Sequence, residues 1–167
     1  TPESIVISGF DPLRREIGRV SLERLLADGR VHPARIEEVV AKTRKEIMEV
    51  VREAGKQAAM DVGVHGLHPE LSAVLGRLHF RTSYGQNVLN HSKEVAWLAE
   101  SIASELGLDA SMIKRAALFH DVGKAVDHEI EGPHALIGAE LAKKYRERPD
   151  VIAGIAGHHG EVPVQSI

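Results

Sequence analysis

The chain has 167 residues, a formal net charge of −3 and 43% hydrophobic residues, an ordinary composition for a globular protein. It contains no cysteine, which excludes disulfides, thiolate catalysis and cysteine-based zinc sites. The sequence shows no secretory signal and no apolar run long enough to span a membrane. Its charge balance is not that of a typical nucleic-acid binder. Ten histidines stand out, because histidine is the commonest metal ligand.

The first 29 residues are predicted to form a short strand followed by a helix. Residues 4–10 read SIVISGF, a run rich in β-branched side chains. Asp11-Pro12 then supplies a helix N-cap and a first-turn proline, and Asp28-Gly29 supplies a stop signal. One strand and one helix cannot form a domain alone, so this segment either packs on the rest of the chain or belongs to a larger unit.

A long helix is predicted next, over residues 34–62. An apolar stripe runs along it, and lysine, glutamate and arginine dominate the opposite face. This pattern indicates an exposed helix that can pack against a partner. The segment 63–69 follows as a loop, because it contains two glycines and ends in proline.

From about residue 65 to the end, the sequence predicts a compact all-α domain. No segment after residue 10 shows the alternation of apolar and polar residues that is typical of a strand. The expected helices end at glycines or begin at prolines or capping residues. They cover residues 70–80, 87–106, 109–120, 133–145 and 149–157.

Four of these helices each carry a histidine at an inward face or a helix end. His91 lies mid-helix, and the spacing of Val88, Val95 and Leu98 around it places its ring on the predicted buried face. His120 ends the next helix and follows inward residues. Taken alone, His91 is better explained as a core residue that is hydrogen-bonded to a carbonyl group, and His120-Asp121 as a coincidental pair with Asp121 at a turn.

The remaining candidates lie at the ends of the last two helices. His134 follows a first-turn proline, and a lone histidine there usually lies on the surface or caps the helix. His158 lies three residues after Ile155 and is expected to face inward, with His159 beside it. Five further histidines are interpreted as surface or structural residues: His32, His65, His68, His79 and His128.

Taken together, the four histidine-bearing helices favour a metal site. Neutral imidazoles around one carboxylate suit zinc, iron, manganese and similar divalent ions. Asp121 is the candidate carboxylate, because an aspartate at a helix C-terminus is unfavourable against the helix dipole unless a cation compensates it. It could bridge two metals through its two oxygens, and such a pair can support phosphoryl displacement. Lys124, three residues later, is either a solvated cation or a contact for a phosphate oxygen.

Several motifs resemble the HD superfamily of metal-dependent phosphohydrolases. The residues that carry this likeness are Asn90-His91, His120-Asp121-Val122-Gly123-Lys124, Gly132-Pro133-His134 and His158-His159-Gly160. Longer runs resemble the bacterial ribonuclease Y family within it, and they cover nearly the whole chain. These runs include VHGLHPEL, RTSYGQNVLNHS, HDVGKAVDHEIEG, ELAKKY and the leading VISGFDPLRREI.

The resemblance implies a fold and a set of domains. Residues 1–29 would be the C-terminal strand and helix of a KH RNA-binding domain, residues 30–65 a long linking helix, and residues 66–167 an HD-domain helical bundle. The family also has an N-terminal membrane anchor and a coiled coil, so the whole protein would be cytoplasmic and held at the inner face of the cell membrane by an anchor absent from this chain.

The resemblance also implies a site. The metal ligands would be His91, His120, Asp121, His134, His158 and His159, holding one or two divalent ions (Mg, Mn, Zn or Fe). His120, Asp121 and Lys124 would be the catalytic residues. The HD pattern needs a further aspartate downstream of His158-His159, yet no aspartate follows Asp150. The chain is therefore expected to be a piece of a longer protein, with its first metal site lacking one ligand.

The function implied is a metal-dependent endoribonuclease that cleaves single-stranded RNA in mRNA turnover, acting as a homodimer with RNA-degradation partners. Two alternatives stay open. One keeps the chemistry but takes a nucleotide or cyclic dinucleotide as substrate. The other is a non-catalytic dimerisation module that assembles through the helix 34–62.

Overall fold

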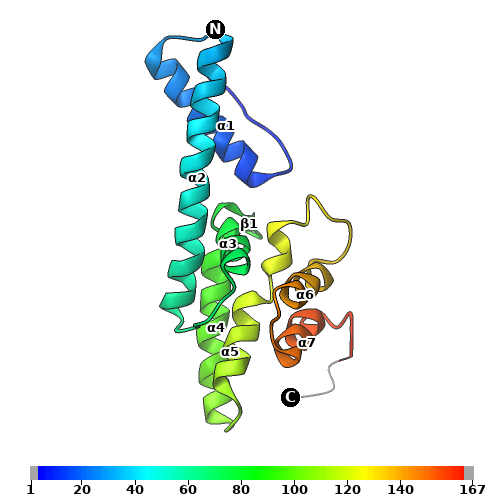
Figure 1. Ribbon diagram of the computed structural model, residues 1–167. Helices are drawn as coiled ribbons and strands as arrows, with labels where there is room; N and C mark the ends of the chain where they lie inside the picture. The colour runs from blue at the N-terminus through cyan, green and yellow to red at the C-terminus, as the bar shows by residue number, and fades with distance from the viewer. Residues whose placement is uncertain (1–3, 164–167) are drawn as a thin grey trace. The chain divides into compact units, whose positions relative to one another are not determined.

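A computed structural model describes residues 4–163, and nearly all of their regular structure is helical (Figure 1). This confirms the all-α prediction. The helices are α1 (Pro12–Asp28), α2 (Pro33–Asp61), α3 (Pro69–Arg77), α4 (Val88–Glu105), α5 (Ala110–Phe119), α6 (His134–Lys144) and α7 (Pro149–Gly157). Two short 3₁₀ helices, η1 (Leu78–Phe80) and η2 (Val122–Ala125), and two short strands, β1 (Thr82–Ser83) and β2 (Gln86–Asn87), complete the order.

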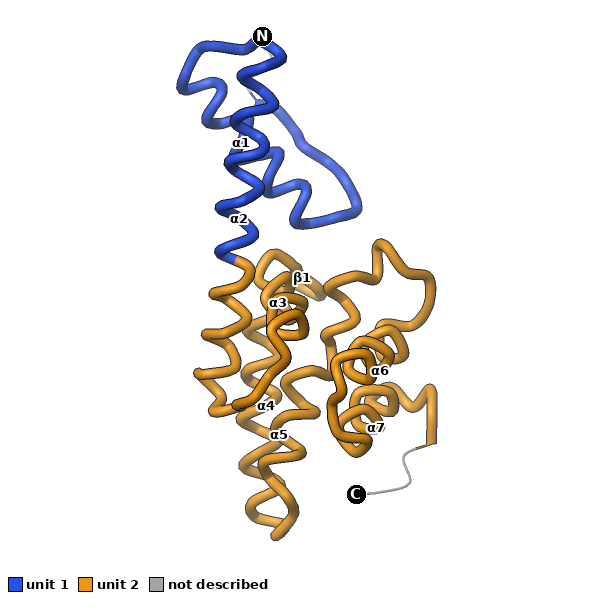
Figure 2. Tube along the Cα trace, in the orientation of Figure 1, with its two compact units in different colours: residues 1–50 blue, residues 51–167 orange. Residues whose placement is uncertain are grey.

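The chain divides into two compact units, residues 1–50 and 51–167 (Figure 2). Helix α2 contributes its first part to one unit and its last part to the other. The predicted boundaries near residues 29 and 65 rest on a resemblance to a domain order, and they stay a prediction.

In the first unit, α1 and the first part of α2 bury a small apolar core. Its buried side chains are Leu13, Ile17, Leu25, Val39 and Ile47. Arg24 ties the two helices together, since it donates to Thr43 Oγ1 over 3.1 Å and pairs with Glu46 at 2.7 Å. The predicted caps of α1 are confirmed: Asp11 accepts from the amide of Leu13 at 2.8 Å, and Gly29 ends the helix with φ of 70°.

The strand predicted over residues 4–10 is wrong. This segment has no regular secondary structure, and Ile5 and Val6 are 64% and 85% exposed. A strand needs a hydrogen-bonded neighbour, and within residues 4–163 the described strands pair only with each other. The β-branched pattern was therefore present without a partner.

In the second unit, the last part of α2 crosses α3 at very short range. A Cβ atom added to Gly55 would lie 1.9 Å from the carbonyl oxygen of Ser72, and one added to Gly76 would lie 1.9 Å from that of Val51. Only glycine permits two backbones to approach this closely. The crossing fixes α3 in the core, where Leu71 and Leu75 are fully buried.

Helices α4 and α5 lie side by side, and α7 packs against both α5 and α6 (Figure 1). The centre of this packing is apolar and dry, with Leu118, Phe119, Val122, Val151 and Ile155 all 0% exposed. Helix caps match the sequence signals, since Asn87 caps α4 and Asp109 caps α5. The core therefore holds the C-terminal end of α5 rigidly against α6 and α7.

The predicted inward face of α4 is partly wrong. Leu98 was expected inside but is 64% exposed, whereas Ser92 and Ala96 are 0% exposed. Small side chains allow close helix packing, and α4 has α5 as its main neighbour. The buried face of α4 is therefore marked by its small residues, and the prediction from its large apolar residues was partly wrong.

A two-stranded hairpin before α4 was also not predicted. Strands β1 and β2 pair antiparallel, with Ser83 opposite Gln86. Each has only two residues, too short for an alternating pattern to be visible.

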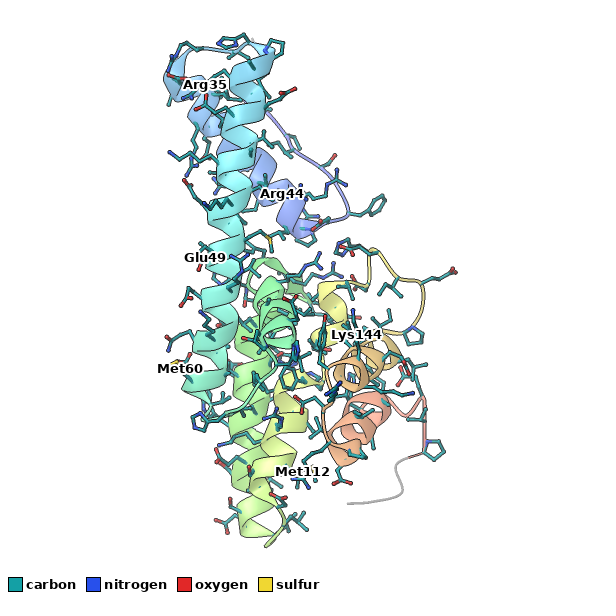
Figure 3. The ribbon with its side chains drawn as sticks, in the orientation of Figure 1. Arg35, Arg44, Glu49, Met60, Met112 and Lys144 are labelled. Atoms are coloured by element: carbon teal, nitrogen blue, oxygen red, sulfur yellow. The ribbon has the colours of Figure 1, made fainter. Side chains whose placement is uncertain are left out.

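The predicted polar side of α2 is present, since Arg44 and Glu49 are exposed together with Met60 (Figure 3). Among residues 4–163, no helix combines the length and the apolar character that a bilayer crossing requires.

Candidate metal centre

Asp121 lies at the centre of the candidate site. It follows His120 directly at the end of α5, where the chain passes into η2, and only 2% of it is exposed. A carboxylate this deeply buried is stable only when cationic or hydrogen-bonding groups surround it. Its two oxygens face two different sets of side chains.

The first set surrounds Oδ2 of Asp121. Nε2 of His120 lies 3.3 Å from this oxygen, and Nε2 of His91 on α4 lies 3.9 Å from it. The ammonium group of Lys124 lies 2.9 Å from the same oxygen and donates a hydrogen bond to it. The ligand atoms of His91, His120 and Asp121 lie within 4.8 Å of one another, which is close enough to hold one metal ion.

The second set surrounds Oδ1. Nε2 of His134 lies 3.2 Å away, and Nε2 of His158 lies 3.8 Å away. Oδ1 is buried and accepts no hydrogen bond from any residue in the described range 4–163. A buried carboxylate oxygen without a donor is costly, and a cation between this oxygen and the imidazoles would remove the cost.

A third imidazole extends this second set. Nε2 of His134 lies 3.3 Å from Nε2 of His158 and 3.2 Å from Nε2 of His159. His134, His158 and His159 therefore form a second group that could hold a metal ion. Three ring nitrogens converge here, an arrangement that suits a divalent cation better than it suits hydrogen bonding among the rings.

Backbone carbonyls orient two of the rings. Nδ1 of His120 lies 2.7 Å from the carbonyl oxygen of Ala117, and Nδ1 of His158 lies 2.7 Å from that of Ile155. In both cases the histidine is just beyond the C-terminal end of its helix, and its ring reaches a carbonyl three residues back in the last helical turn. When Nδ1–H donates to the carbonyl, Nε2 keeps its lone pair for a metal.

Glycine at position 123 lets α6 approach the carboxylate. A Cβ atom there would lie 2.0 Å from the carbonyl oxygen of His134 and 2.8 Å from the amide nitrogen of Gly138. The first turn of α6 thus rests directly on η2. This contact places the His134 ring against Asp121.

The surroundings favour a charged Asp121 and neutral forms of His134 and His158. Burial alone would raise the pKa of Asp121, but its contacts with His120 and Lys124 lower that pKa far below its usual value. Burial lowers the pKa of His134, and the nearby Lys124 lowers it further. Burial also lowers the pKa of His158. Metal binding requires these protonation states.

We expect these shifts to make the metal-free protein less stable as pH falls through 6.5. Because the folded-state pKa values of His134 and His158 lie below the ordinary value of 6.5, the unfolded chain binds more protons in that range, and proton uptake favours unfolding. Urea unfolding in chelator should therefore show a lower midpoint at pH 5.5 than at pH 7.5. The variant His158→Gln should show a smaller difference, and equal differences in both proteins would contradict the assignment.

All the residues that the sequence singled out come together at this site: His91, His120, Asp121, Lys124, His134, His158 and His159. The surface interpretation of His68 is also consistent with the structure, because this exposed residue caps α3 by accepting from the amide of Glu70 at 3.2 Å. The orienting carbonyls of Ala117 and Ile155 were not predicted from the sequence. A histidine just past a helix end was a usable signal for them.

Comparisons with known proteins agree with this geometry. Residues 88–166 match the family model described as "HD domain". The chain is 61% identical over all 167 residues to "Ribonuclease Y" of Clostridium kluyveri, covering 32% of that protein. It is 64% identical over 167 residues to "Ribonuclease Y" of Enterococcus faecalis, again covering 32%. The protein of the same name from Bacillus velezensis is 61% identical over 167 residues, with 32% of it covered.

No solved structure matches the chain. The chain spans about a third of the length of the curated relatives it matches. The histidines and the aspartate of the candidate site all lie within residues 88–166, the part that matches the family model. Residues 88–166 thus match the HD domain model, and the chain is similar along its whole length to about a third of each ribonuclease Y protein.

Proposed function

We propose that this chain carries the hydrolytic centre of an HD-type, metal-dependent phosphodiesterase that cleaves single-stranded RNA. The single observation that carries the proposal is the buried carboxylate of Asp121, whose two oxygens face imidazole nitrogens from α4, α6 and the ends of α5 and α7. The names of the relatives support RNA as the substrate. Action in mRNA turnover, assembly as a homodimer and association with RNA-degradation partners or a membrane are further proposals from the same likeness.

The residues present fit divalent metal ions. Oδ1 of Asp121 is buried without a hydrogen-bond donor in the described part of the chain, and the nearby donor atoms are imidazole nitrogens. His91, His120 and Asp121 would hold one ion, and His134, His158 and His159, with Asp121 beside them, would hold a second. Imidazole and carboxylate ligands are compatible with Mn, Fe or Zn, and with Mg to a lesser degree. Divalent ions in such a site lower the pKa of water and draw charge from a phosphoryl oxygen.

The chain's own residues then have distinct tasks. His120 and His158 present fixed Nε2 atoms, because backbone carbonyls hold their Nδ1 atoms. Asp121 remains charged near neutral pH and links the two groups through its two oxygens. Because His134 and His158 have lowered pKa values, they stay neutral and do not repel a cation.

Lys124 is the residue best placed to contact the phosphodiester. Its ammonium group lies 2.9 Å from Asp121 Oδ2, and only 16% of its side chain is exposed. A cation next to the site can move from the carboxylate to a non-bridging phosphate oxygen, where it offsets the charge that develops during displacement. This role needs no change in the backbone of η2.

A cleavage assay with manganese tests the proposal. We expect the protein to cut an unstructured RNA oligonucleotide, to leave mononucleotides and cyclic dinucleotides intact, and to lose cleavage when His120→Ala removes a ligand. A preference for the small nucleotides would instead support the alternative substrate class. If neither substrate turned over and the wild-type protein and the variant behaved alike, the non-catalytic alternative would be favoured.

A further inference from the structure

The tip of the β1–β2 hairpin carries an aromatic ring that residues 4–163 leave fully exposed. Tyr84 is 101% exposed, although aromatic residues are scarce in this sequence. The neighbouring residues of the hairpin, Thr82, Ser83, Gly85 and Gln86, are polar or small. The ring therefore gains no burial and adds nothing to the core.

The backbone at this tip is unfavourable for tyrosine. Tyr84 has φ of 50° and Gly85 has φ of 79°, so both residues of the two-residue loop have positive φ. Such a turn prefers asparagine, aspartate or glycine at its first position, because the left-handed region is strained for other side chains. Tyrosine thus strains the hairpin without the compensation of packing. Strain of this kind is characteristic of functional positions.

Contacts at both ends of the hairpin tie it to segments that neighbour the candidate metal centre in sequence. Asn87, which ends β2, donates to the carbonyl of His79 at 2.7 Å and caps α4 one turn before His91. Arg81, which precedes β1, pairs at 2.8 Å with Asp127, six residues beyond Asp121. From strand and helix rises along the chain, the Cα atoms of Tyr84 and His91 are at most about 16 Å apart. The ring is therefore held on a rigid element at a short distance from the site.

We propose that Tyr84 is a stacking platform for an unpaired base of the single-stranded nucleic acid that is cut at the metal centre. This inference rests on the proposed function and adds a substrate-binding residue to it. A single exposed ring is sufficient for base stacking, because every base has an aromatic face. A protein partner, by contrast, needs a contiguous apolar core at its interface, and the polar and small neighbours of Tyr84 do not provide one.

The test compares how tightly the wild-type protein and variants at Tyr84 bind a fluorescein-labelled, unstructured RNA oligonucleotide. The buffer contains chelator so that the RNA stays intact. Tyr84→Asn removes the ring while supplying a residue that the turn prefers. We expect RNA affinity to fall by roughly 5- to 150-fold, the range for losing one base stack. Tyr84→Phe should bind within about twofold of the wild-type protein, because the ring is retained.

Two controls separate stacking from misfolding. The melting temperature of Tyr84→Asn should be unchanged or higher by about 2–4 °C, since turn strain is relieved. Leu106→Asn, which removes an exposed apolar side chain (67%) at the C-terminal end of α4, should leave RNA affinity unchanged.

Fluorescence gives a further readout of stacking. In a Trp97→Phe background, the indole fluorescence of Tyr84→Trp should be quenched by RNA and not by mononucleotides at the same concentration.

Equal RNA affinity of the wild-type protein and Tyr84→Asn would overturn the proposal, as would an absence of RNA binding by either protein. Hydrolysis of bis(p-nitrophenyl) phosphate by the wild-type protein with manganese reports the proposed function separately. Failure of that hydrolysis would count against the phosphodiesterase assignment, while the binding comparison would still decide the role of Tyr84.

Discussion

Asp121→Asn should abolish both metal binding and hydrolysis, with the largest loss of function of any single substitution in the chain. The amide keeps the shape of the carboxylate but removes the negative charge that faces His91 and His120 on one side and His134 and His158 on the other. Replacing a residue that only orients a metal ligand typically lowers metal affinity about 10- to 100-fold. For Asp121, a ligand itself, we therefore expect metal affinity to fall by at least about 100-fold. Isothermal titration with Mn²⁺ measures this loss directly.

Asp127→Asn is the matched control. Asp127 lies in the same segment and is paired at 2.8 Å with Arg81, outside both groups of metal-capable side chains at the centre. We expect its substitution to leave Mn²⁺ affinity within about threefold, because a salt bridge of this kind contributes little to a distant site. Similar losses in Asp121→Asn and Asp127→Asn would mean that general loosening of the segment, and not ligation by Asp121, explains the effect.

Gly123→Ala should destabilise the second unit and impair the metal group on α6 at the same time. The added Cβ would meet the carbonyl oxygen of His134 at 2.0 Å, and backbone atoms on both sides leave no flexible side chain to yield. Helix α6 must then move away from η2. Overpacking of a core costs about 1–3 kcal/mol, and we expect about 3 kcal/mol here because the clash is with backbone. Urea unfolding followed through Trp97, the single tryptophan, measures it.

Gly18→Ala serves as the comparison, because we expect it to raise stability where Gly123→Ala lowers it. Gly18 lies inside α1, and a Cβ there would meet Cγ2 of Ile7 at an ordinary 3.7 Å. Replacing a helix-interior glycine with alanine removes backbone entropy from the unfolded chain, so we expect a gain of about 0.5–1 kcal/mol, measured by circular dichroism. If Gly123→Ala were as well tolerated as Gly18→Ala, the close approach of α6 to η2 would not be needed to place His134.

Local signals in the sequence were enough to predict most helices. Asp11 and Gly29 delimit α1, and Asn87 and Asp109 cap α4 and α5, because side chains and glycines satisfy helix ends through contacts within a few residues. The failures involve contacts with distant segments. Residues 4–10 have strand-like composition but no partner strand among the described residues, and the hairpin that does form is held by its turn and by anchors outside it.

In the candidate site, too, the features set by local sequence were predictable and those set by contacts between distant segments were not. Histidines on four helices and one aspartate at a helix end predicted which side chains would converge. The resemblance implied a first metal site with His91 and His120 and a second with His134 and His158, both sharing Asp121. Which oxygen of Asp121 each pair faces could not be read from the sequence, because it depends on how closely α6 approaches η2. In the sequence, Gly123 stood out only as part of the motif 120–124, and the close approach that its missing side chain permits became visible in the structure.

The central claim is that imidazole nitrogens around Asp121 form a binding site for divalent cations. The most direct test is a metal count per chain by elemental analysis after dialysis against Mn²⁺, with His120→Ala treated in parallel. We expect one or two ions per wild-type chain, fewer in the variant, and stabilisation of the wild-type protein by about 2.7 kcal/mol at a hundredfold excess of free ion over Kd. A wild-type chain that retained no metal and unfolded at the same urea concentration with Mn²⁺ as with chelator would contradict the claim.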